Sequence, residues 1–213
     1  MLSRTPSARS KAIVALWLGL AALAAAVAPP AWAQSQWVIG VSGGMTKPTG
    51  GWFSSEWGTG PTVLLTVAQQ NGGKVELGGE FGFTKFEPSG DSVHVPGITP
   101  GDIKWEQWRL RFRARRFFAG ADSKIAPFAM AGAGVYPLTI LTEDSTGVFK
   151  VTPTGKGLSI GGGVDYRAGE SVHFGIEAQY HHVWVDQAEV GYKAAPFTDI
   201  LFAIRWLPGT GPE

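Results

Sequence analysis

Arginine occupies every second position from 109 to 115 in the stretch RLRFRARRFF, residues 109 to 118, and apolar residues lie between the arginines. Successive side chains of a strand point to opposite faces, so this period of two predicts a β-strand with one cationic and one apolar face. On a helix the four arginines would be scattered at steps of about 200°. Two settings fit such a strand. The arginines face water on an antiparallel sheet, or they face the inside of a closed barrel whose apolar side meets lipid.

The first 33 residues have the organisation of a secretory signal peptide. A basic start precedes an apolar run from Ala12 to Val27, and Ala31-Trp32-Ala33 forms a small-x-small cleavage site. The apolar run is shorter than the roughly 20 residues that a membrane-spanning helix needs. We therefore expect export, cleavage after Ala33 and a mature chain that begins at Gln34.

The composition of the remaining chain favours β-structure. The whole sequence, signal peptide included, has 30 Gly, 9 Trp and 12 Phe, which suits close backbone packing and an interface that accepts aromatic side chains. It has no cysteine, which excludes thiol chemistry and Cys-ligated metal, and its net charge of +1 gives no indication of nucleic-acid binding. Residues 34–213 are enough for one domain.

Eight segments show β character, and none shows helical periodicity. They are residues 37–46, 61–70, 75–86, 103–118, 126–141, 157–167, 172–185 and 198–207. Their connections alternate between long (47–60, 87–102, 142–156, 186–197) and short (71–74, 119–125, 168–171). This is the order of an up-and-down outer-membrane barrel with long loops outside and short turns in the periplasm. Greek-key crossovers of a sandwich do not predict such alternation.

We therefore predict an all-β protein, an eight-stranded antiparallel up-and-down transmembrane β-barrel preceded by a cleaved signal peptide. The domains are the signal peptide (1–33), the barrel (34–207) and a short periplasmic tail (208–213). A soluble barrel of the lipocalin kind, with its apolar faces in a core, is the alternative.

The interior of an eight-stranded barrel is just wide enough to be filled by side chains. A hairpin centred near residue 95 places Glu80 opposite about residue 110 and Glu76 opposite about residue 114, so carboxylates meet arginines across the strands. The alternation rule adds charges from other strands, and both signs are present, as buried charges require. The predicted lumen charge network is Glu76, Glu80, Arg109, Arg111, Arg113, Arg115, Asp165, Arg167, Glu177, Asp199 and Arg205. It predicts a salt-bridged, closed lumen.

Aromatic residues are expected in two belts at the membrane interfaces. The belt near the short turns comprises Trp37, Phe118, Tyr166 and Trp206, and the belt near the long loops comprises Phe83, Trp108, Tyr136 and Trp184. The first long loop is also aromatic, with Trp52, Phe53 and Trp57 in GWFSSEWG. These three side chains are expected to cap the barrel, to dip into the outer leaflet or to contact a partner.

Three segments in the second half of the chain carry a resemblance: IAPFAMAGAGVYPLT, GLSIGGGVDYRAGESVHFGIEAQYHHVWVD and FTDILFAIRW. They resemble the last four strands of the small OmpA-like, or porin-like, outer-membrane β-barrels. The resemblance implies a monomeric barrel in a Gram-negative outer membrane, surrounded by lipid and lipopolysaccharide and inserted by the barrel-assembly machinery. It implies no single activity, because the family spans structural anchors, adhesins and surface antigens. Family members commonly end on an aromatic residue, whereas here Trp206 is followed by residues 207–213.

The candidate catalytic and cofactor motifs in the sequence do not fit the chemistry they would serve. Some eight-stranded barrels modify lipid A with serine or histidine chemistry, but no serine follows His181 and His182 at the two-residue step of the deacylase-like barrels. The two histidines point to opposite strand faces and cannot share a metal ion. The glycine run 161–163 lies inside a strand with no helix after it, so it does not fit a dinucleotide loop.

We therefore expect no catalytic, cofactor or metal site and no enzyme activity. The predicted function is a structural anchor or surface-interaction protein of the outer membrane, with an extracellular ligand contacted through the loops. A lipid A-modifying enzyme and a narrow channel for small solutes remain open alternatives.

Overall fold

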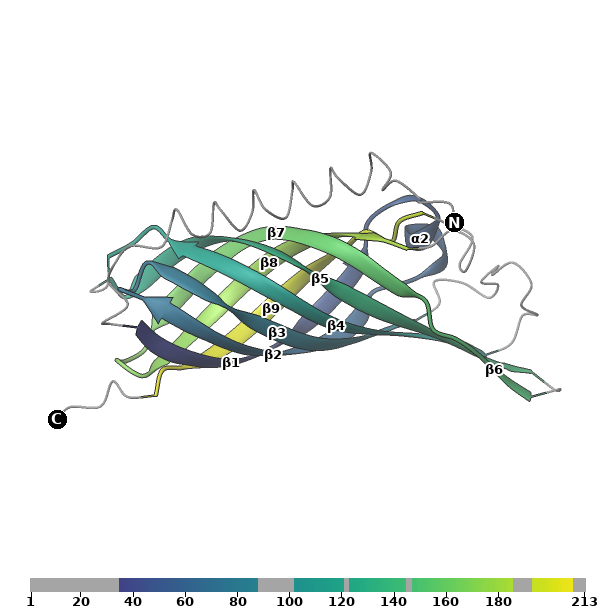
Figure 1. Cartoon of the computed structure of the whole chain (residues 1–213), viewed down its shortest axis with the longest axis horizontal. Helices are drawn as coiled ribbons and strands as arrows, with labels where there is room; N and C mark the ends of the chain where they lie inside the picture. Colours follow the sequence, from purple (N-terminus) through teal and green to yellow (C-terminus); the bar gives the residue numbers. More distant parts are fainter. Residues whose placement is uncertain (1–34, 88–101, 121–122, 145–146, 186–192, 209–213) are drawn as a thin grey trace, which may run out of the picture. The chain divides into compact units, whose positions relative to one another are not determined.

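A computed structural model describes residues 35–87, 102–120, 123–144, 147–185 and 193–208 (Figure 1). The predicted signal peptide lies outside these residues, and so do residues 209–213 of the tail, so both assignments remain predictions. Within the described ranges, no helix combines the length and the apolar character needed to cross a membrane.

Antiparallel strands joined in a ring dominate the described residues. They are β1 (Ser35–Pro48), β2 (Gly60–Asn71), β3 (Val75–Phe86), β4 (Asp102–Phe117), β5 (Ile125–Asp144), β6 (Gly147–Val151), β7 (Thr154–Arg167), β8 (Val172–Trp184) and β9 (Phe197–Trp206). The order around the sheet is β4-β3-β2-β1-β9-β8-β7-β5, and pairing of β4 with β5 closes it. Eight described strands therefore form a closed barrel, which confirms the predicted fold class.

The sequence explains why these segments form strands and where they turn. Buried side chains alternate with more exposed ones along the whole of β9, because apolar residues at every second position face outward. Between β2 and β3 the chain reverses through Asn71-Gly72-Gly73-Lys74, where Gly72 and Gly73 have φ values of 51° and 66°. Glycine accepts this left-handed backbone without a steric penalty, so the turn is as short as the sequence predicts.

Two described elements were not expected from the sequence. The helix α2 (Gly51–Glu56) lies in the first long loop, and β6 pairs with the last part of β5 to extend a hairpin beyond the barrel. Both lie at the same end of the barrel, the end of the long loops (Figure 1). The eight predicted segments agree with the observed strands to within three residues at each boundary.

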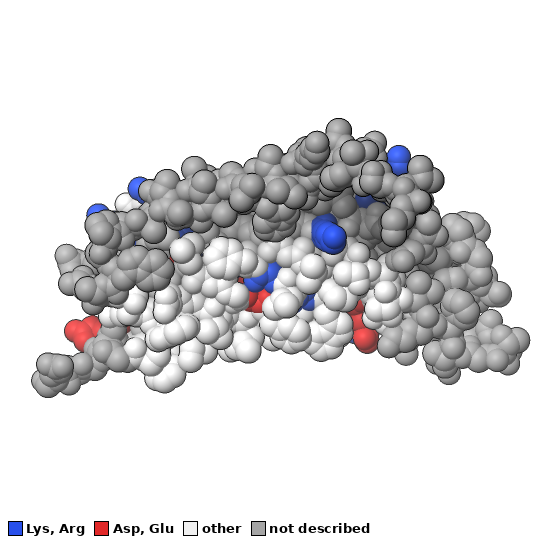
Figure 2. Space-filling model, in the orientation of Figure 1, with Lys and Arg blue, Asp and Glu red and all other residues white. Residues whose placement is uncertain are grey.

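The outer wall of the barrel is apolar. Phe112, Ile176 and Phe202 are 55%, 64% and 51% exposed, although each lies in the middle of a strand. Figure 2 shows that uncharged side chains cover most of the described wall on the face it presents. Large apolar side chains exposed over a whole wall would be unfavourable in water, and they are the surface that lipid requires.

Seven of the eight predicted belt residues point outward. Six are among the exposed large side chains (Trp37, Trp108, Phe118, Tyr166, Trp184 and Trp206), and Phe83 is half-buried against Trp108. Tyr136 was placed in the belt wrongly, because it is fully buried inside the barrel. On β5 the inward face includes Ala126 and Phe128, and Tyr136 lies an even number of residues further along.

Candidate functional site

The register of β3 and β4 brings carboxylates and arginines together inside the barrel. Glu80 lies opposite Arg111 and Glu76 lies opposite Arg115, one residue further along than the sequence predicted. The difference arises because the hairpin is centred between residues 95 and 96. All four side chains are buried.

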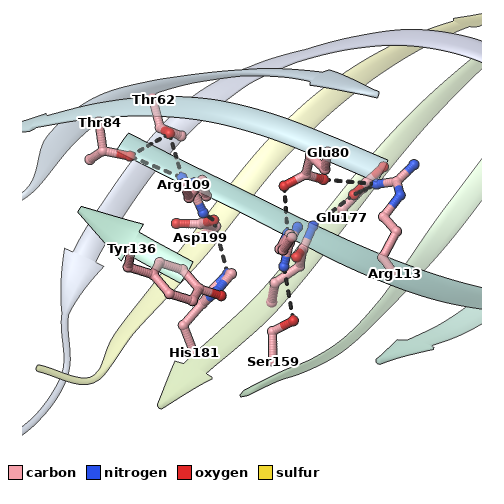
Figure 3. Close-up of polar contacts among 12 residues, drawn as sticks. Thr62, Glu80, Thr84, Arg109, Arg113, Tyr136, Ser159, Glu177, His181 and Asp199 are labelled. Carbon is pink, nitrogen blue, oxygen red and sulfur yellow. Dashed lines mark hydrogen bonds and ion pairs between the residues drawn. The ribbon is translucent and has the colours of Figure 1, made fainter. Parts of the chain in front are cut away.

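Arg111 and Arg113 hold the centre of the lumen. Arg111 Nε donates to Glu80 Oε1 at 2.6 Å, and its Nη1 donates to Ser159 Oγ at 2.9 Å. Arg113 donates through Nη1 to Glu80 Oε2 at 3.1 Å and through Nη2 to Glu76 Oε1 at 2.9 Å. Glu80 is therefore shared by Arg111 and Arg113, and Figure 3 shows its contact with Arg113.

Arg115 and Arg205 extend the network toward the short turns. Arg115 Nη2 donates to Glu177 Oε1 at 2.6 Å. Arg205 pairs with Asp165, and it also lies 3.6 Å from Glu76. Five different strands contribute these side chains, so the ion pairs connect opposite sides of the barrel.

Arg109 anchors the end of the network nearest the long loops, because it is the first of the four alternating arginines along β4. Figure 3 shows it beside Thr62, Thr84 and Asp199. Its Nη1 donates to Asp199 Oδ2 at 2.5 Å, and its Nη2 donates to the hydroxyls of Thr62 and Thr84 at 2.6 and 2.9 Å. One guanidinium thus ties β4 to β9, β2 and β3 at a single level of the barrel.

His181 joins the network at the same level. Its Nε2 lies 3.1 Å from Asp199 Oδ2, the oxygen that also accepts from Arg109. Its other ring nitrogen is 3.1 Å from the hydroxyl of Tyr136. A neutral His181 protonated on Nε2 suits both neighbours, since its N–H lies on the side of the carboxylate and its Nδ1 can accept from the phenol.

The charges in this arrangement balance. We call the lumen network the ten buried residues Arg109, Arg111, Arg113, Arg115, Arg205, Glu76, Glu80, Asp165, Glu177 and Asp199, five of each sign. Buried charge is tolerated only when it is paired and hydrogen-bonded, and each member has an opposite charge within 4.0 Å. Arg167, predicted as an eleventh member, lies instead at the edge of the barrel, where its Nη1 donates to the carbonyl of Gly120 at 2.8 Å.

Apolar layers lie at both ends of the lumen network. The mouth cluster, at the long-loop end, contains Phe53, Trp57, Phe86, Trp105, Tyr136, Leu138, Ile140, Val183, Ala195 and Phe197. The turn cluster, at the other end, contains Phe117, Ala126, Phe128 and Met130. Guanidinium groups join the layers, since Arg109 lies over Phe197 at 5.5 Å and Arg115 over Phe128 at 4.2 Å.

The aromatic residues of the first long loop enter this mouth cluster. Phe53 and Trp57 are each 1% exposed and pack on Trp105, with ring centroids 5.0 and 4.8 Å apart. Of the three alternatives for the loop, the structure gives these two side chains the capping position, and they are not available at the surface to contact a partner. The side chain of Trp52 lies outside the described residues.

Sequence reasoning missed most of the neutral partners of the network. Thr46, Thr62, Ser159 and Gln179 each form a hydrogen bond with a network charge. Alternation alone puts these residues on inward faces, so the signal for their location was present. The sequence gives no comparable signal for their hydrogen-bond partners. Several of these bonds cross the barrel between strands that are not neighbours, and the alternation within one strand does not say how two distant strands are aligned.

The site offers little for chemistry among the described residues. No group of three or more metal-ligating side chains is placed to hold an ion there. His181 is enclosed between Asp199 and Tyr136 and is itself fully buried, beside the ring of Phe197 at 4.4 Å. The arrangement neutralises and fixes charge inside the barrel.

An apolar outer wall around a closed ring of strands, with a paired ionic network inside, defines a transmembrane β-barrel. The model of the outer membrane protein beta-barrel domain matches residues 13–197. The chain therefore belongs to this family and is a protein of the bacterial outer membrane, which confirms the resemblance drawn from its second half.

Two solved structures show the same fold at low sequence identity, and a third is less similar. Neisserial surface protein A matches with a TM-score of 0.60 and 12% identity, over 81% of this chain and 97% of that one. A major outer membrane protein of Thermus thermophilus matches with a TM-score of 0.52 and 10% identity, over 81% and 99%. The attachment invasion locus protein Ail of Yersinia pestis is more distant, with a TM-score of 0.45, 14% identity and coverages of 81% and 96%. Among curated proteins, no sequence matches this chain.

Proposed function

We propose that this protein is a non-enzymatic structural or surface-interaction protein, whose barrel is a closed anchor and whose long-loop end meets the outside. The balanced lumen network between two apolar layers supports this proposal most directly. Ten charges joined across the barrel lock its side chains together, and the layers at both ends separate them from water.

A closed lumen follows from the energetics of such packing. A solute that crosses the barrel would have to displace the aromatic side chains of the mouth cluster and then separate ion pairs such as Arg111–Glu80, at 2.6 Å. A buried charge that loses its partner is costly, and removing one partner of such a pair typically costs about 3–5 kcal/mol. A solute would meet several in succession, which argues against the channel alternative.

Electrical recording tests the closed lumen. Purified wild-type protein in planar bilayers is expected to give no discrete conductance steps, and its folded state is verified by heat-modifiable migration on a gel. Reproducible steps from the folded protein would overturn the closed-anchor proposal and favour a channel.

The enzymatic alternative has a separate test. A lipid A-modifying enzyme needs a general base that reaches a nucleophile and substrate. Here His181 is 0% exposed, and its phenol partner Tyr136 belongs to the mouth cluster. Mass spectrometry of lipid A is expected to give the same acyl pattern with and without the gene. A changed acyl pattern that depends on His181 would contradict a non-enzymatic role.

A surface role is the finer part of the proposal. The long-loop end carries α2 and the β5–β6 hairpin, which extends past the barrel (Figure 1). Loops on a rigid scaffold are where binding functions concentrate. Replacing residues 145–146, which connect β5 to β6 in the sequence, with an epitope tag tests the orientation. Intact cells are expected to bind the antibody, and binding only after permeabilisation would contradict it.

A further inference from the structure

Basic side chains gather on one side of the barrel at the short-turn end. Lys74, Arg116 and Lys124 are exposed there, and Arg167 is half-buried. Lys74 precedes β3, Lys124 precedes β5, and the two arginines lie at the ends of β4 and β7. These four strands are successive neighbours in the ring, and strands lie about 4.8 Å apart, so the four residues span about 15 Å. We call them the turn-end patch.

Backbone hydrogen bonds fix the members of the patch in two pairs. The backbone N–H of the residue after Arg116 donates to the carbonyl of Lys74 at 2.8 Å. The backbone N–H of Arg167 donates to the carbonyl of Lys124, also at 2.8 Å. The Arg167 side chain then reaches the carbonyl of Gly120, in the turn that follows Arg116. Strand ends with a fixed register therefore hold the four cations on one side of the ring.

The turn-end patch has few acidic neighbours. In the part of the chain that the structure describes, Lys74, Arg116 and Lys124 form no ion pair, whereas each lumen arginine faces a carboxylate. The exposed acidic residue described at these turns is Glu170, between β7 and β8. Figure 2 shows basic and acidic groups apart from each other at this end, on the left of the view. The sequence adds Asp122 in the β4–β5 turn, so basic residues still outnumber acidic ones.

The patch lies at the depth of an aromatic belt. Phe118, two residues after Arg116, is 66% exposed, and Tyr166, next to Arg167, is 50% exposed. Aromatic belts mark the headgroup region of a membrane. Arg116 itself is on the outward face of β4, since the neighbouring Arg115 is buried in the lumen. An outward cation near the interface is tolerated and lies at the level of lipid phosphates.

We propose that the turn-end patch binds the headgroup of an anionic phospholipid, one whose phosphate is not neutralised by an ammonium group. A guanidinium can donate to two phosphate oxygens at once, and lysines add positive charge around it. The exposed rings of the belt lie where the headgroup joins the acyl chains. This site goes beyond the proposed function, since an anchor needs hydrocarbon around its wall and no particular headgroup.

Fluorescence quenching at two turns locates the lipid. Nothing lies within 4 Å of a Cβ added at Gly120, in the patch, or at Gly169, beside Glu170, and the chain has no native cysteine. Gly120→Cys and Gly169→Cys each carry a fluorophore in nanodiscs of phosphatidylcholine. A minor component, either phosphatidylglycerol or phosphatidylcholine with a nitroxide near the start of one acyl chain, quenches the fluorophores that it approaches.

Phosphatidylglycerol is expected to be enriched over labelled phosphatidylcholine about fivefold at Gly120→Cys, since one basic residue near a membrane contributes a preference of roughly this size. At Gly169→Cys the two lipids are expected to quench equally. High salt is expected to reduce the enrichment, because it screens exposed charges. Equal enrichment at both positions, or none at Gly120→Cys, would overturn the proposal.

Two triple variants, each with the fluorophore in the β4–β5 turn, separate local binding from net charge. The patch variant is Lys74→Gln/Arg116→Gln/Lys124→Gln. The control variant removes three exposed cations at the long-loop end, Lys47→Gln/Lys85→Gln/Lys156→Gln. All six positions are exposed, so both variants are expected to fold, as heat-modifiable migration verifies. The patch variant is expected to lose the phosphatidylglycerol enrichment and the control variant to keep it. Enrichment that survives in the patch variant, or that falls equally in both, would contradict a headgroup site at the patch.

Discussion

Arg113 reaches three carboxylates from one position on β4, with Glu76, Glu80 and Glu177 at 2.9, 3.1 and 3.8 Å. A guanidinium suits this position because its planar set of donors can serve several acceptors at once, whereas an ammonium is a point charge. Arg113 therefore neutralises part of the charge of several carboxylates, and its loss affects more than one ion pair.

Arg113→Met is therefore expected to destabilise the barrel by about 3–5 kcal/mol, the usual cost of removing one partner of a buried pair. The physical reason is that Glu76 and Glu80 keep their charges in a low-dielectric interior with one fewer partner. The measurement is a urea titration of the folded fraction in lipid vesicles, read from the unboiled band on a gel.

Arg116→Met is the matched control on the same strand. Arg116 is exposed at the short-turn end, so its replacement is expected to change stability by less than about 0.5 kcal/mol. The double variant Arg113→Met/Glu80→Gln is expected to recover part of the loss, because it removes the excess negative charge. Equal effects of Arg113→Met and Arg116→Met would show that the network contributes nothing specific.

Tyr136 provides a second test at this scale. Its hydroxyl is 3.1 Å from His181 Nδ1 in the barrel interior, so Tyr136→Phe is expected to cost about 1–3 kcal/mol by leaving the ring nitrogen unpaired. Tyr166→Phe, in the exposed belt, is expected to be nearly neutral by the same titration. A larger loss of stability for Tyr166→Phe than for Tyr136→Phe would contradict the buried position of Tyr136 and favour its predicted place in the aromatic belt.

Individual residues were predictable wherever charge marks one face of a strand. The arginines of β4 and the glutamates of β3 fix the inward face by themselves, and alternation then extends it to Asp165, Glu177 and Asp199. β5 has no charge over residues 125–142, and apolar residues occupy both of its faces, so nothing local distinguishes the side of Tyr136. The prediction for Arg167 was wrong for a different reason. Arg167 is the last residue of β7, so its side chain lies at the edge of the barrel and not in the interior.

At the scale of the element, β3 depends on a glycine that makes room for an arginine. A Cβ at Gly82 would lie 2.4 Å from Leu64 Cδ2 and 2.9 Å from both Cγ and Nε of Arg109. Gly82→Ala is therefore expected to displace Arg109 and to cost about 1–3 kcal/mol, as overpacking does. Gly79→Ala is the control on the same strand, since nothing lies within 4 Å of its added Cβ and it is expected to be neutral or slightly stabilising.

The same vesicle titration compares the two glycine variants. A loss of stability for Gly79→Ala that equals the loss for Gly82→Ala would mean that strand propensity, and not the space around Arg109, controls the result.

Elements with a long repeating pattern were predictable, and short ones were not. The period of two over ten or more residues identifies the barrel strands, and tight turns such as Asn71 to Lys74 end them sharply. α2 has only six residues, too few to show a helical period, and it forms because the mouth cluster accepts Phe53 and Trp57. β6 likewise depends on the end of β5 as its template. Both elements are products of tertiary contacts.

The barrel as a whole is ordered in layers along its axis and across its wall. Along the axis, the lumen network lies between the mouth cluster and the turn cluster, with a cation over an aromatic ring at each junction. Across the wall, from inside to outside, the ionic interior is followed by the hydrogen-bonded strands and then by the apolar surface. This is the reverse of a soluble barrel, so the environment of the outer wall is the property on which the whole interpretation depends.

Site-directed spin labels test that property directly, because the chain has no native cysteine to remove. Single cysteines at Phe112, Ile176 and Phe202 would carry labels from three different strands, all from exposed positions. In lipid vesicles these labels are expected to be relaxed by oxygen, which concentrates in the hydrocarbon, and shielded from a water-soluble nickel chelate.

Gly169, in the exposed turn between β7 and β8, has nothing within 4 Å of an added Cβ and gives the reference for water contact. A label there is expected to respond to the nickel chelate more strongly than to oxygen. If the three wall labels behaved like the label at Gly169, the apolar wall would face water, and neither the membrane location of the strands nor an inward-facing lumen network would stand. If the three wall labels respond more strongly to oxygen than to the nickel chelate, unlike the label at Gly169, lipid surrounds the wall. This is the same wall that the alternation of the sequence leaves uncharged.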